Sequence, residues 1–593
     1  MDLSRKMTYP RALSLPFRVI PFYTLLGLLQ QIIGLAIAPI SVLVTAYFID
    51  TALVVVGEGL GASRIVPPLI ALGVFQIYNY ILWPLMGLAN TKGRMKTQLK
   101  MRVPLVEKRA RLEFKHLENN ETVDLLNRVW DNPEGKLSGM FNTLTQFLRE
   151  MGVTASYAVI LLAHAPLAGS MLIVLSVPIF WLAIKSGKAT YQAQRDKTER
   201  DRYVGTVGWF IHGREPAGER SLFCYAEKMA DKYLAGFEDV RKWQLRIGAL
   251  WFARSKSASV ILGLLSTAAL FMLAPSVANG SLTVGLYIAL IGALFSTVHS
   301  MSWSLPYYFR QFTTEREYLK EFNRFLELTE ARDAEALPVT PPPNFEKLEF
   351  KNVSFTYPGT EKVILNGLNL TIENGKHYAF VGINGAGKTT ITKLITRLYD
   401  DYDGEILLNG KELREWEIPV IKAMFCALFQ DFVRYDITVA ENAAIGKANG
   451  AADEEIDRAL SLSGFDAKAE SLKEGKNTLL GKTHDNGVDL SGGEWQRLAF
   501  ARAIISPAAV KILDEPTAAL DPVAESQVYE KFESISKGFT TIFISHRLAS
   551  AKMADIIYVL DGGKVTEQGN HGTLMKKSGL YAEMFESQRG WYA

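Results

Sequence analysis

The sequence predicts a multidomain chain, in which an all-α membrane domain of six helices precedes an α/β domain that contains a glycine-rich loop. Two observations lead to this fold class. The first half holds long apolar runs with few charges, as membrane spans require. The second half holds the pattern G-x-x-x-x-G-K-[ST] at 382–389, between a strand-like and a helix-like segment. A chain of 593 residues is also too long for one hydrophobic core.

Six segments are long and apolar enough to cross a membrane. The long segments between some of them, 91–140 and 186–256, are rich in Lys and Arg, whereas the short loops are nearly free of both. By the positive-inside rule, these long segments and both termini are expected in the cytoplasm. Because the first apolar run is too long for a signal peptide, we interpret it as a retained span. The six segments lie near 19–49, 65–90, 144–165, 167–187, 250–275 and 281–304.

The long cytoplasmic segments show helical spacing of apolar residues in 117–129 and 219–237. We expect membrane helices that continue into the cytoplasm and turn back there. An amphipathic helix lying on the membrane surface is the alternative.

Polar residues within the expected spans allow two interpretations. They can line a substrate cavity together with nearby aromatic residues, or they can form hydrogen bonds between packed helices. The sequence leaves both open. The polar residues are Gln30, Gln31, Gln76, Asn79, His299 and Ser300, and the aromatic ones are Tyr80, Trp83 and Trp303.

Composition excludes several classes of function. The formal net charge of +3 gives no reason to expect nucleic acid as a partner. Two cysteines, Cys224 and Cys426, are too few for a disulfide framework or a cysteine-based zinc site.

A proline-rich stretch at 338–343 marks the domain boundary. We expect a transmembrane domain over 1–312, a linker over 313–344 and the α/β domain over 345–588.

The glycine-rich loop is expected to bind phosphate. Its glycines let several backbone N–H groups surround an anion, and the following helix adds the positive end of its dipole. Lys388 would contact the β- and γ-phosphates of a nucleotide, and the Thr389 hydroxyl would ligate Mg²⁺. The expected nucleotide-binding residues of the loop are Gly382, Ile383, Asn384, Gly385, Ala386, Gly387, Lys388, Thr389 and Thr390.

Two further segments carry charge or glycines at positions suited to this chemistry. The apolar strand 509–513 ends in Asp514, placed to hold Mg²⁺, and Glu515, placed to polarise a water molecule. A second glycine pair opens a helix and is suited either to bind phosphate or to serve as a simple helix cap. It lies within Ser491, Gly492, Gly493 and Glu494.

These motifs together resemble the ATP-binding cassette transporters, since Leu490–Glu494 nearly repeats the L-S-G-G-Q signature of that family. A membrane domain preceding the cassette is similar to the half-size exporters of type IV architecture. The resemblance implies an all-α six-helix transmembrane domain, an α/β P-loop NTPase ATP-binding cassette, and ATP with Mg²⁺ as cofactors.

The resemblance also assigns roles to single residues. Tyr357 matches the aromatic that stacks on adenine, and Gln430 matches the glutamine that reaches Mg²⁺ and the attacking water. Asp521 matches the loop that crosses the dimer interface, and His546 matches the histidine that senses the γ-phosphate. The expected catalytic residues are therefore Glu515, His546, Lys388 and Gln430, and the expected metal ligands are Thr389, Gln430 and Asp514. Glu494, Ala519 and Asp485 depart from the commonest family pattern.

In this family a phosphate loop and a signature from two different cassettes enclose each ATP, so a dimer is implied. Because no hydrolytic residue is lost, we expect a homodimer with two competent sites, and a heterodimer stays open. Cytoplasmic helix tips near 119–126 and 205–215 are expected to dock on the cassettes.

The expected function is export of a peptide, lipid or drug-like substrate from the cytoplasm or inner leaflet across the plasma (inner) membrane of a bacterium. An ATP-gated channel or regulator with the same cassette is the alternative. The membrane spans argue against a soluble ATPase, and fusion of the two domains argues against an importer. The stretch 429–435 is similar to that of a branch containing lantibiotic-type peptide exporters, but it does not identify the substrate.

Overall fold

The computed structural model describes residues 5–59, 61–164, 200–482, 486–515, 539–545 and 548–592, together with single positions between 165 and 199. The chain forms two compact units. The first, called the helical unit, comprises Met1–Glu107 and Asp124–Leu328, and the second, called the cassette unit, comprises Lys108–Val123 and Thr329–Ala593.

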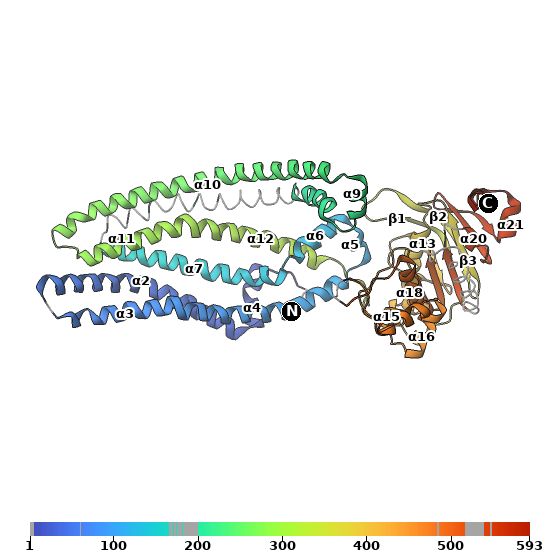
Figure 1. Ribbon diagram of the computed structural model, residues 1–593, viewed down its shortest axis with the longest axis horizontal. Helices are drawn as coiled ribbons and strands as arrows, with labels where there is room; N and C mark the ends of the chain where they lie inside the picture. The colour runs from blue at the N-terminus through green and yellow to red at the C-terminus, as the bar shows by residue number, and fades with distance from the viewer. Residues whose placement is uncertain are drawn as a thin grey trace. The chain divides into compact units, whose positions relative to one another are not determined.

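Long helices make up the helical unit, and several of them run side by side (Figure 1). The N-terminal α2 packs on α3, α7 and α11, and α10 packs on α11. Two π-helical turns, η2 and η3, continue directly into the helices that follow them. The elements are α1 (Tyr9–Val19), α2 (Pro21–Glu58), η1 (Ala62–Arg64), α3 (Val66–Ile77), η2 (Tyr78–Leu82), α4 (Trp83–Ala110), α6 (Asn120–Trp130), α7 (Pro133–His164), α9 (Ala217–Phe223), α10 (Ala226–Ala278), α11 (Val284–His299), η3 (Ser300–Ser304) and α12 (Leu305–Glu327).

Most apolar side chains of α2 are not buried within the unit, which is the reverse of the pattern in a helix of a water-soluble protein. The helix is strongly apolar, yet only Thr24, Gln30, Ala46 and Val55 are buried in it. Gln30 lies inside the unit, where its amide donates to the carbonyl oxygen of Trp83 at 3.2 Å. Apolar side chains on the outside and polar groups paired on the inside are the pattern expected in lipid.

Among the described residues, three helical segments are long and apolar enough to span a membrane: Pro21–Glu58, Ala62–Ala110 and Val284–Glu327. They contain the second of the expected spans and nearly all of the first and the sixth. The third expected span, 144–165, lies largely in α7, and the fifth, 250–275, lies in α10. The fourth, 167–187, falls mainly outside the described residues.

The cassette unit is built on two sheets. One is an antiparallel sheet with strand order β2-β1-β4-β5, and the other is a six-stranded sheet with order β10-β9-β3-β8-β7-β6. The elements are α5 (Phe114–Glu118), β1 (Lys347–Thr356), β2 (Val363–Glu373), β3 (His377–Gly382), α13 (Lys388–Ile395), β4 (Asp403–Leu408), β5 (Lys411–Glu412), η4 (Leu413–Glu415), α14 (Ile418–Met424), β6 (Phe425–Leu428), α15 (Val439–Ala444), α16 (Asp453–Leu462), α17 (Asp466–Ser471), η5 (Gly475–Asn477), α18 (Gly492–Ile505), β7 (Val510–Asp514), β8 (Thr540–Ile544), α20 (Leu548–Ala551), β9 (Ile556–Asp561), β10 (Lys564–Gly569), α21 (His571–Lys577) and α22 (Leu580–Tyr592).

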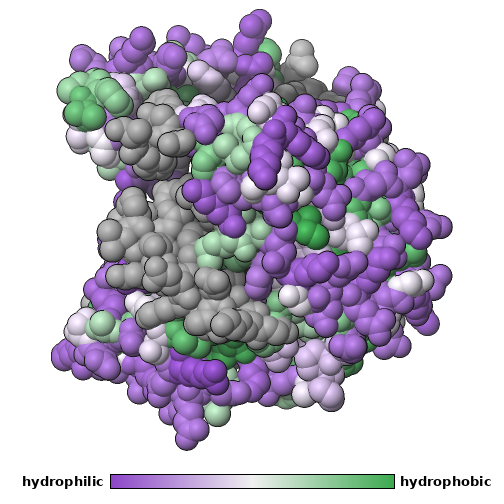
Figure 2. Space-filling view, turned by 90° about the vertical axis from the view of Figure 1, so that its right-hand side faces the viewer, coloured by the Kyte–Doolittle hydropathy of each residue, from purple (hydrophilic) through white to green (hydrophobic). Residues whose placement is uncertain are grey.

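Strands β9, β3, β8, β7 and β6 of the larger sheet are parallel to one another, whereas the edge strand β10 is antiparallel to β9. Strands β7 and β8 are buried at every residue, as expected for a parallel sheet covered on both faces. The outer face of the cassette unit in Figure 2 is mainly hydrophilic, with scattered hydrophobic residues. The α/β fold of this unit therefore agrees with the prediction, and its buried sheet places the ends of five parallel strands at one edge.

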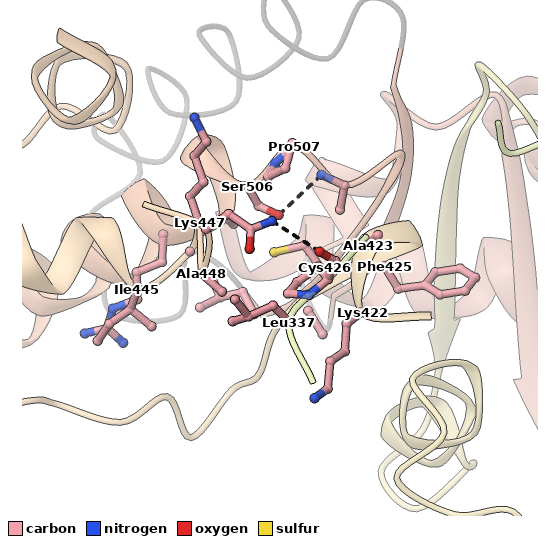
Figure 3. Close-up of a pocket in the computed structure, with 18 of the residues that line it drawn as sticks. Leu337, Lys422, Ala423, Phe425, Cys426, Ile445, Lys447, Ala448, Ser506 and Pro507 are labelled. Carbon is pink, nitrogen blue, oxygen red and sulfur yellow. Dashed lines mark hydrogen bonds between the residues drawn. The ribbon is translucent and has the colours of Figure 1, made fainter. Parts of the chain in front are cut away.

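The proline-rich segment 334–342 is attached to the surface of the cassette unit. The Lys422 ammonium donates to the carbonyl oxygens of Ala334 at 2.6 Å and Ala336 at 3.0 Å. The Asn449 amide donates to the carbonyl oxygen of Pro338 at 3.2 Å. Between this segment, β6 and α18 lies a cavity of about 820 Å³, and Figure 3 shows Leu337, Lys422 and other side chains that line it.

Candidate nucleotide-binding site

The ends of parallel strands bring the expected site residues together. The glycine-rich loop follows β3, Asp514 ends β7, and Gln430 lies two residues beyond β6. Because β3, β8, β7 and β6 are adjacent and parallel, their carboxyl ends open at the same edge of the sheet.

The backbone of the glycine-rich loop requires its glycines. Gly385 and Gly387 have φ angles of 83° and 98°, which L residues with a side chain rarely adopt. A Cβ atom on Gly387 would lie 2.6 Å from Cδ2 of Leu365. The loop then passes into α13 at Lys388, so its N–H groups and the helix N-terminus are available to one anion.

Lys388 is held by its own loop. Its ammonium donates to the carbonyl oxygens of Gly382 at 2.7 Å and Ile383 at 3.1 Å. Burial lowers the pKa of Lys388, although the carboxylates of Asp514 and Glu515 oppose this shift. A buried cation with two nearby carboxylates is well placed to bind the phosphates of a nucleotide with its metal ion.

Asp514 has the chemistry of a metal ligand. Its carboxylate accepts a hydrogen bond from the Thr389 hydroxyl at 2.9 Å. Burial raises the pKa of Asp514 to about 6, and the carboxylate of Glu515 adds to this rise, while the Thr389 hydroxyl and Lys388 oppose it. A buried carboxylate beside a hydroxyl is a pair of oxygen donors that fits Mg²⁺.

Glu515 is held in a strained conformation by two glutamines. Its φ angle is 47°, in the left-handed region where non-glycine residues are uncommon. The Gln430 amide donates to Oε2 of Glu515 at 3.0 Å, and the Gln496 amide donates to its backbone carbonyl at the same distance. The sequence analysis did not identify Gln496; it is buried and lies in α18, five residues after Ser491.

Tyr357 follows β1 and presents its ring near the phosphate loop. Its hydroxyl lies 3.0 Å from Oγ1 of Thr390 in α13. Its ring makes edge contacts with the rings of Phe355 and Tyr399, at centroid distances of 5.0 and 5.4 Å. The Lys393 ammonium lies 5.2 Å from the centroid of the same ring. The ring is therefore fixed from several sides.

One cavity of about 700 Å³ contains most of the expected nucleotide-binding residues. Sequence reasoning missed Lys362 and Ile364, which enter the cavity from the start of β2 and belong to no motif. The lining residues are Tyr357, Lys362, Ile364, Asn384, Gly385, Gly387, Lys388, Thr389, Thr390, Gln430, Asp514, Glu515 and Ile544.

The signature residues lie elsewhere in the same cassette unit. Ser491 caps α18 through a capping box, in which its hydroxyl accepts from the Glu494 N–H and the Glu494 carboxylate accepts from the Ser491 N–H. The segment 491–494 does not line the cavity of the phosphate loop. His546, Asp521 and Asp485 fall outside the described residues.

A short helix from the first half of the sequence completes the surroundings of Tyr357. Glu118 of α5 pairs with the Lys393 ammonium at 2.5 Å and accepts a hydrogen bond from the Tyr399 hydroxyl. Phe114 makes an edge contact with the Tyr399 ring at 5.7 Å. The contact expected near 119–126 is therefore found in part: Lys108–Val123 belong to the cassette unit and the Asn119 side chain lies against Gly359, while the ion pair and the ring contact come from α5 just before that segment.

Comparison with known proteins agrees with this geometry. Residues 365–518 match the family model described as ABC transporter. This segment of the chain is therefore an ABC transporter domain by sequence similarity. The subtilin transport ATP-binding protein SpaT of Bacillus subtilis is 29% identical over 509 residues, which cover 84% of this chain and 81% of that protein.

Other known proteins are similar to this chain in the cassette or in the fold. The ATP-dependent lipid A-core flippase of Pseudomonas aeruginosa is 39% identical over 238 residues, and that alignment spans 40% of this chain and 39% of the flippase. A bacterial Atm1-family ABC exporter, solved with ATP bound, superimposes with a TM-score of 0.74 at 22% identity, over 95% of this chain and 98% of that one. The fold therefore extends to both units.

Proposed function

We propose that this chain is a half-size ABC exporter that hydrolyses ATP to move a substrate out of the cytoplasm or the inner leaflet. One observation carries the proposal: the expected phosphate-binding, metal-binding and water-activating residues line one cavity, next to a helix that joins two membrane-domain helices. Similarity to the subtilin transporter and to a lipid A-core flippase supports export as the direction.

The cavity residues suit the hydrolysis of a nucleoside triphosphate. Loop N–H groups and Lys388 bind the phosphates, and the Tyr357 ring stacks on the base. Thr389, Asp514 and Gln430 would hold Mg²⁺, which would supply positive charge to the β- and γ-phosphates. Glu515 accepts a proton from the attacking water, and Gln430 orients the Glu515 carboxylate.

Two copies of the chain are needed in this proposal. Ser491 and the glycines that follow it are suited to bind phosphate, yet they do not line the phosphate-loop cavity of their own cassette unit. We infer that they act on the nucleotide of a second cassette, which makes ATP the link between two subunits. A homodimer in the bacterial inner membrane is the assembly that this arrangement favours.

Helix α5 offers a direct route from nucleotide to membrane domain. It lies between α4 and α6, and its Glu118 contacts Lys393 and Tyr399, which both touch the ring of Tyr357. Binding of adenine on this ring would therefore change the packing around Glu118. In this proposal α5 passes that change to the helical unit as a rigid-body displacement.

The variant Glu515→Gln tests the proposed hydrolysis. We expect it to bind MgATP with wild-type affinity and to lose nearly all turnover, because the amide cannot take a proton from water. Phosphate release and binding of a fluorescent ATP analogue would be measured on detergent-purified protein, with the exposed Glu415→Gln as the matched control. Wild-type turnover in Glu515→Gln would sink the assignment, and ATP-gated ion currents without vectorial transport would favour the channel alternative.

A further inference from the structure

The helical unit contains a cavity of about 740 Å³, formed by residues of α7, α10, α11 and η3. Three of its residues, Glu150, Lys256 and Trp303, belong to the third, fifth and sixth expected membrane spans. Ionisable side chains are rare in such segments and generally mark functional positions. The cavity therefore combines an apolar location with charged walls.

Lys256 is the unusual member of this group. Its Nζ lies 3.2 Å from the centroid of the Trp303 ring and donates to the carbonyl oxygen of Ser302 at 3.0 Å. Among the described residues, no carboxylate forms an ion pair with it. An ammonium group in an apolar region without a counter-charge is costly, because neither water nor an anion compensates the lost hydration.

A carbonyl oxygen of η3, that of Ser302, accepts the hydrogen bond that holds Lys256 in this position. Residue 306 is a proline, which has no N–H to donate to the carbonyl oxygen of Ser302 as an α-helix would require. Lys256 donates to this carbonyl instead, and one hydrogen bond leaves donor capacity on its ammonium group. Single π-helical turns such as η3 are frequent at functional sites.

The other charged residue that lines the cavity, Glu150, forms its ion pair with a cation other than Lys256. Glu150 is already paired with Arg149 at 2.5 Å, so Lys256 is the cation that this carboxylate does not compensate. Apolar side chains of Val260 and Phe295 form other parts of the wall. A ligand that matches these features needs an anionic group for Lys256 and an apolar body for the rest of the cavity.

We propose that Lys256 and Trp303 form part of a binding site for an anionic amphipath, a molecule with a phosphate or carboxylate group and an alkyl or similarly apolar body. The inference deepens the proposed function, because it assigns this class of molecule as the transported substrate. Trp303 holds the ammonium in place when the site is free, and the anionic group of the substrate completes its coordination.

Binding is tested first on the full-length protein in phosphatidylcholine nanodiscs without nucleotide. The probes are dodecyl phosphate, dodecyl maltoside and dodecyltrimethylammonium, which share one alkyl chain and differ in head-group charge. We expect wild-type protein to bind dodecyl phosphate most tightly. Lys256→Gln should weaken this binding by about tenfold or more, whereas Lys256→Arg should largely retain it. The exposed Lys232→Gln on the same helix is the matched control.

ATPase activity then separates the inference from the proposed function. We expect dodecyl phosphate to stimulate ATP hydrolysis in the wild type and much less in Lys256→Gln, each compared with the rate of the same protein without the probe. Nanodiscs with and without phosphatidylglycerol distinguish a membrane lipid from a free amphiphile as the source of the anion. Equal binding of the three probes, or loss of binding in Lys256→Arg to the level of Lys256→Gln, would overturn the inference. Absence of any ATP hydrolysis would instead overturn the proposed function.

Discussion

Because the carboxylate of Asp514 is buried, we predict that Asp514→Asn stabilises the nucleotide-free protein and removes most of the rise in unfolding temperature that MgATP causes. The rise of this pKa from 3.8 to about 6 corresponds to a cost of about 3 kcal/mol for the ionised form. The unfolded chain loses the proton near pH 4, whereas the folded protein keeps it until about pH 6. Stability therefore falls between these two pH values, and the whole cost is present above pH 6.

Asp514→Asn removes the ionisation and keeps an oxygen that accepts from the Thr389 hydroxyl. Near neutral pH we expect the variant to unfold at a temperature roughly 5 to 10 °C above wild type without nucleotide, given the size of the cassette unit. The gain in unfolding temperature that MgATP gives the wild type should be largely lost, because the neutral amide lacks the negative charge with which the Asp514 carboxylate would hold Mg²⁺.

Thermal unfolding of detergent-purified protein, followed by intrinsic fluorescence, measures both effects. The scans compare wild type and variant with and without MgATP, near neutral pH and at about pH 4, where the difference without nucleotide should largely vanish. An unfolding temperature below wild type in the nucleotide-free variant at neutral pH would refute the reasoning. A difference of equal size at both pH values would also refute it, since the cost would then not come from ionisation.

Three further substitutions test other contacts. Gly387→Ala should weaken binding of a fluorescent ATP analogue by about tenfold or more, because its Cβ would lie 2.6 Å from the Leu365 side chain. Gln496→Ala should lower kcat about tenfold at similar ATP affinity in steady-state assays, because the Glu515 carbonyl loses its donor. Lys422→Ala should speed protease cleavage in 333–340, measured by gel electrophoresis, since the bonds that hold this segment are removed.

Each of these predictions has its own control or contrary result. Gly410 has a similar φ angle of 79° but open space around its Cβ position, so Gly410→Ala should leave ATP affinity unchanged. A Gln496→Ala protein with normal kcat and a raised KM would assign that residue to binding. Cleavage of Lys422→Ala at the wild-type rate would mean that the bonds from Asn449 to Pro338 and from the Val339 N–H to Pro419 are enough to secure the segment.

Local sequence signals were sufficient to select most of the residues that the structure brings together in the candidate nucleotide-binding cavity. Loop glycines, Lys388 and the carboxylates after an apolar strand each belong to a short motif, and parallel strands necessarily bring such motifs to one edge. The motifs do not give the order of the strands in the sheet, which only the structure shows. Strand β8 lies between β3 and β7, so the phosphate loop after β3 and Asp514 at the end of β7 are separated by a single strand. The positions of Lys362 and Ile364 depend on the second sheet and carry no pattern of their own.

Contacts between distant segments were beyond sequence reasoning. Helical periodicity placed a docking region near 119–126, but the contact depends on the positions of Lys393 and Tyr399, more than two hundred residues further along the chain. Lys256 was overlooked for a different reason. The residues predicted to line a cavity were polar residues such as glutamine, asparagine and serine. A lysine within an apolar run indicates a functional position more strongly, because a charged group in a membrane span is more costly.

The chain passes between the two units at three points, after Glu107, after Val123 and after Leu328. A fragment starting in the proline-rich segment would therefore lack α5, although α5 belongs to the cassette unit. Such a fragment would leave the Tyr399 ring uncovered and the Lys393 ammonium without its acidic partner. Nucleotide affinities measured on such a truncated cassette would describe a cassette unit without residues 108–123. A synthetic peptide spanning 108–123, added to the fragment, should restore the missing contacts.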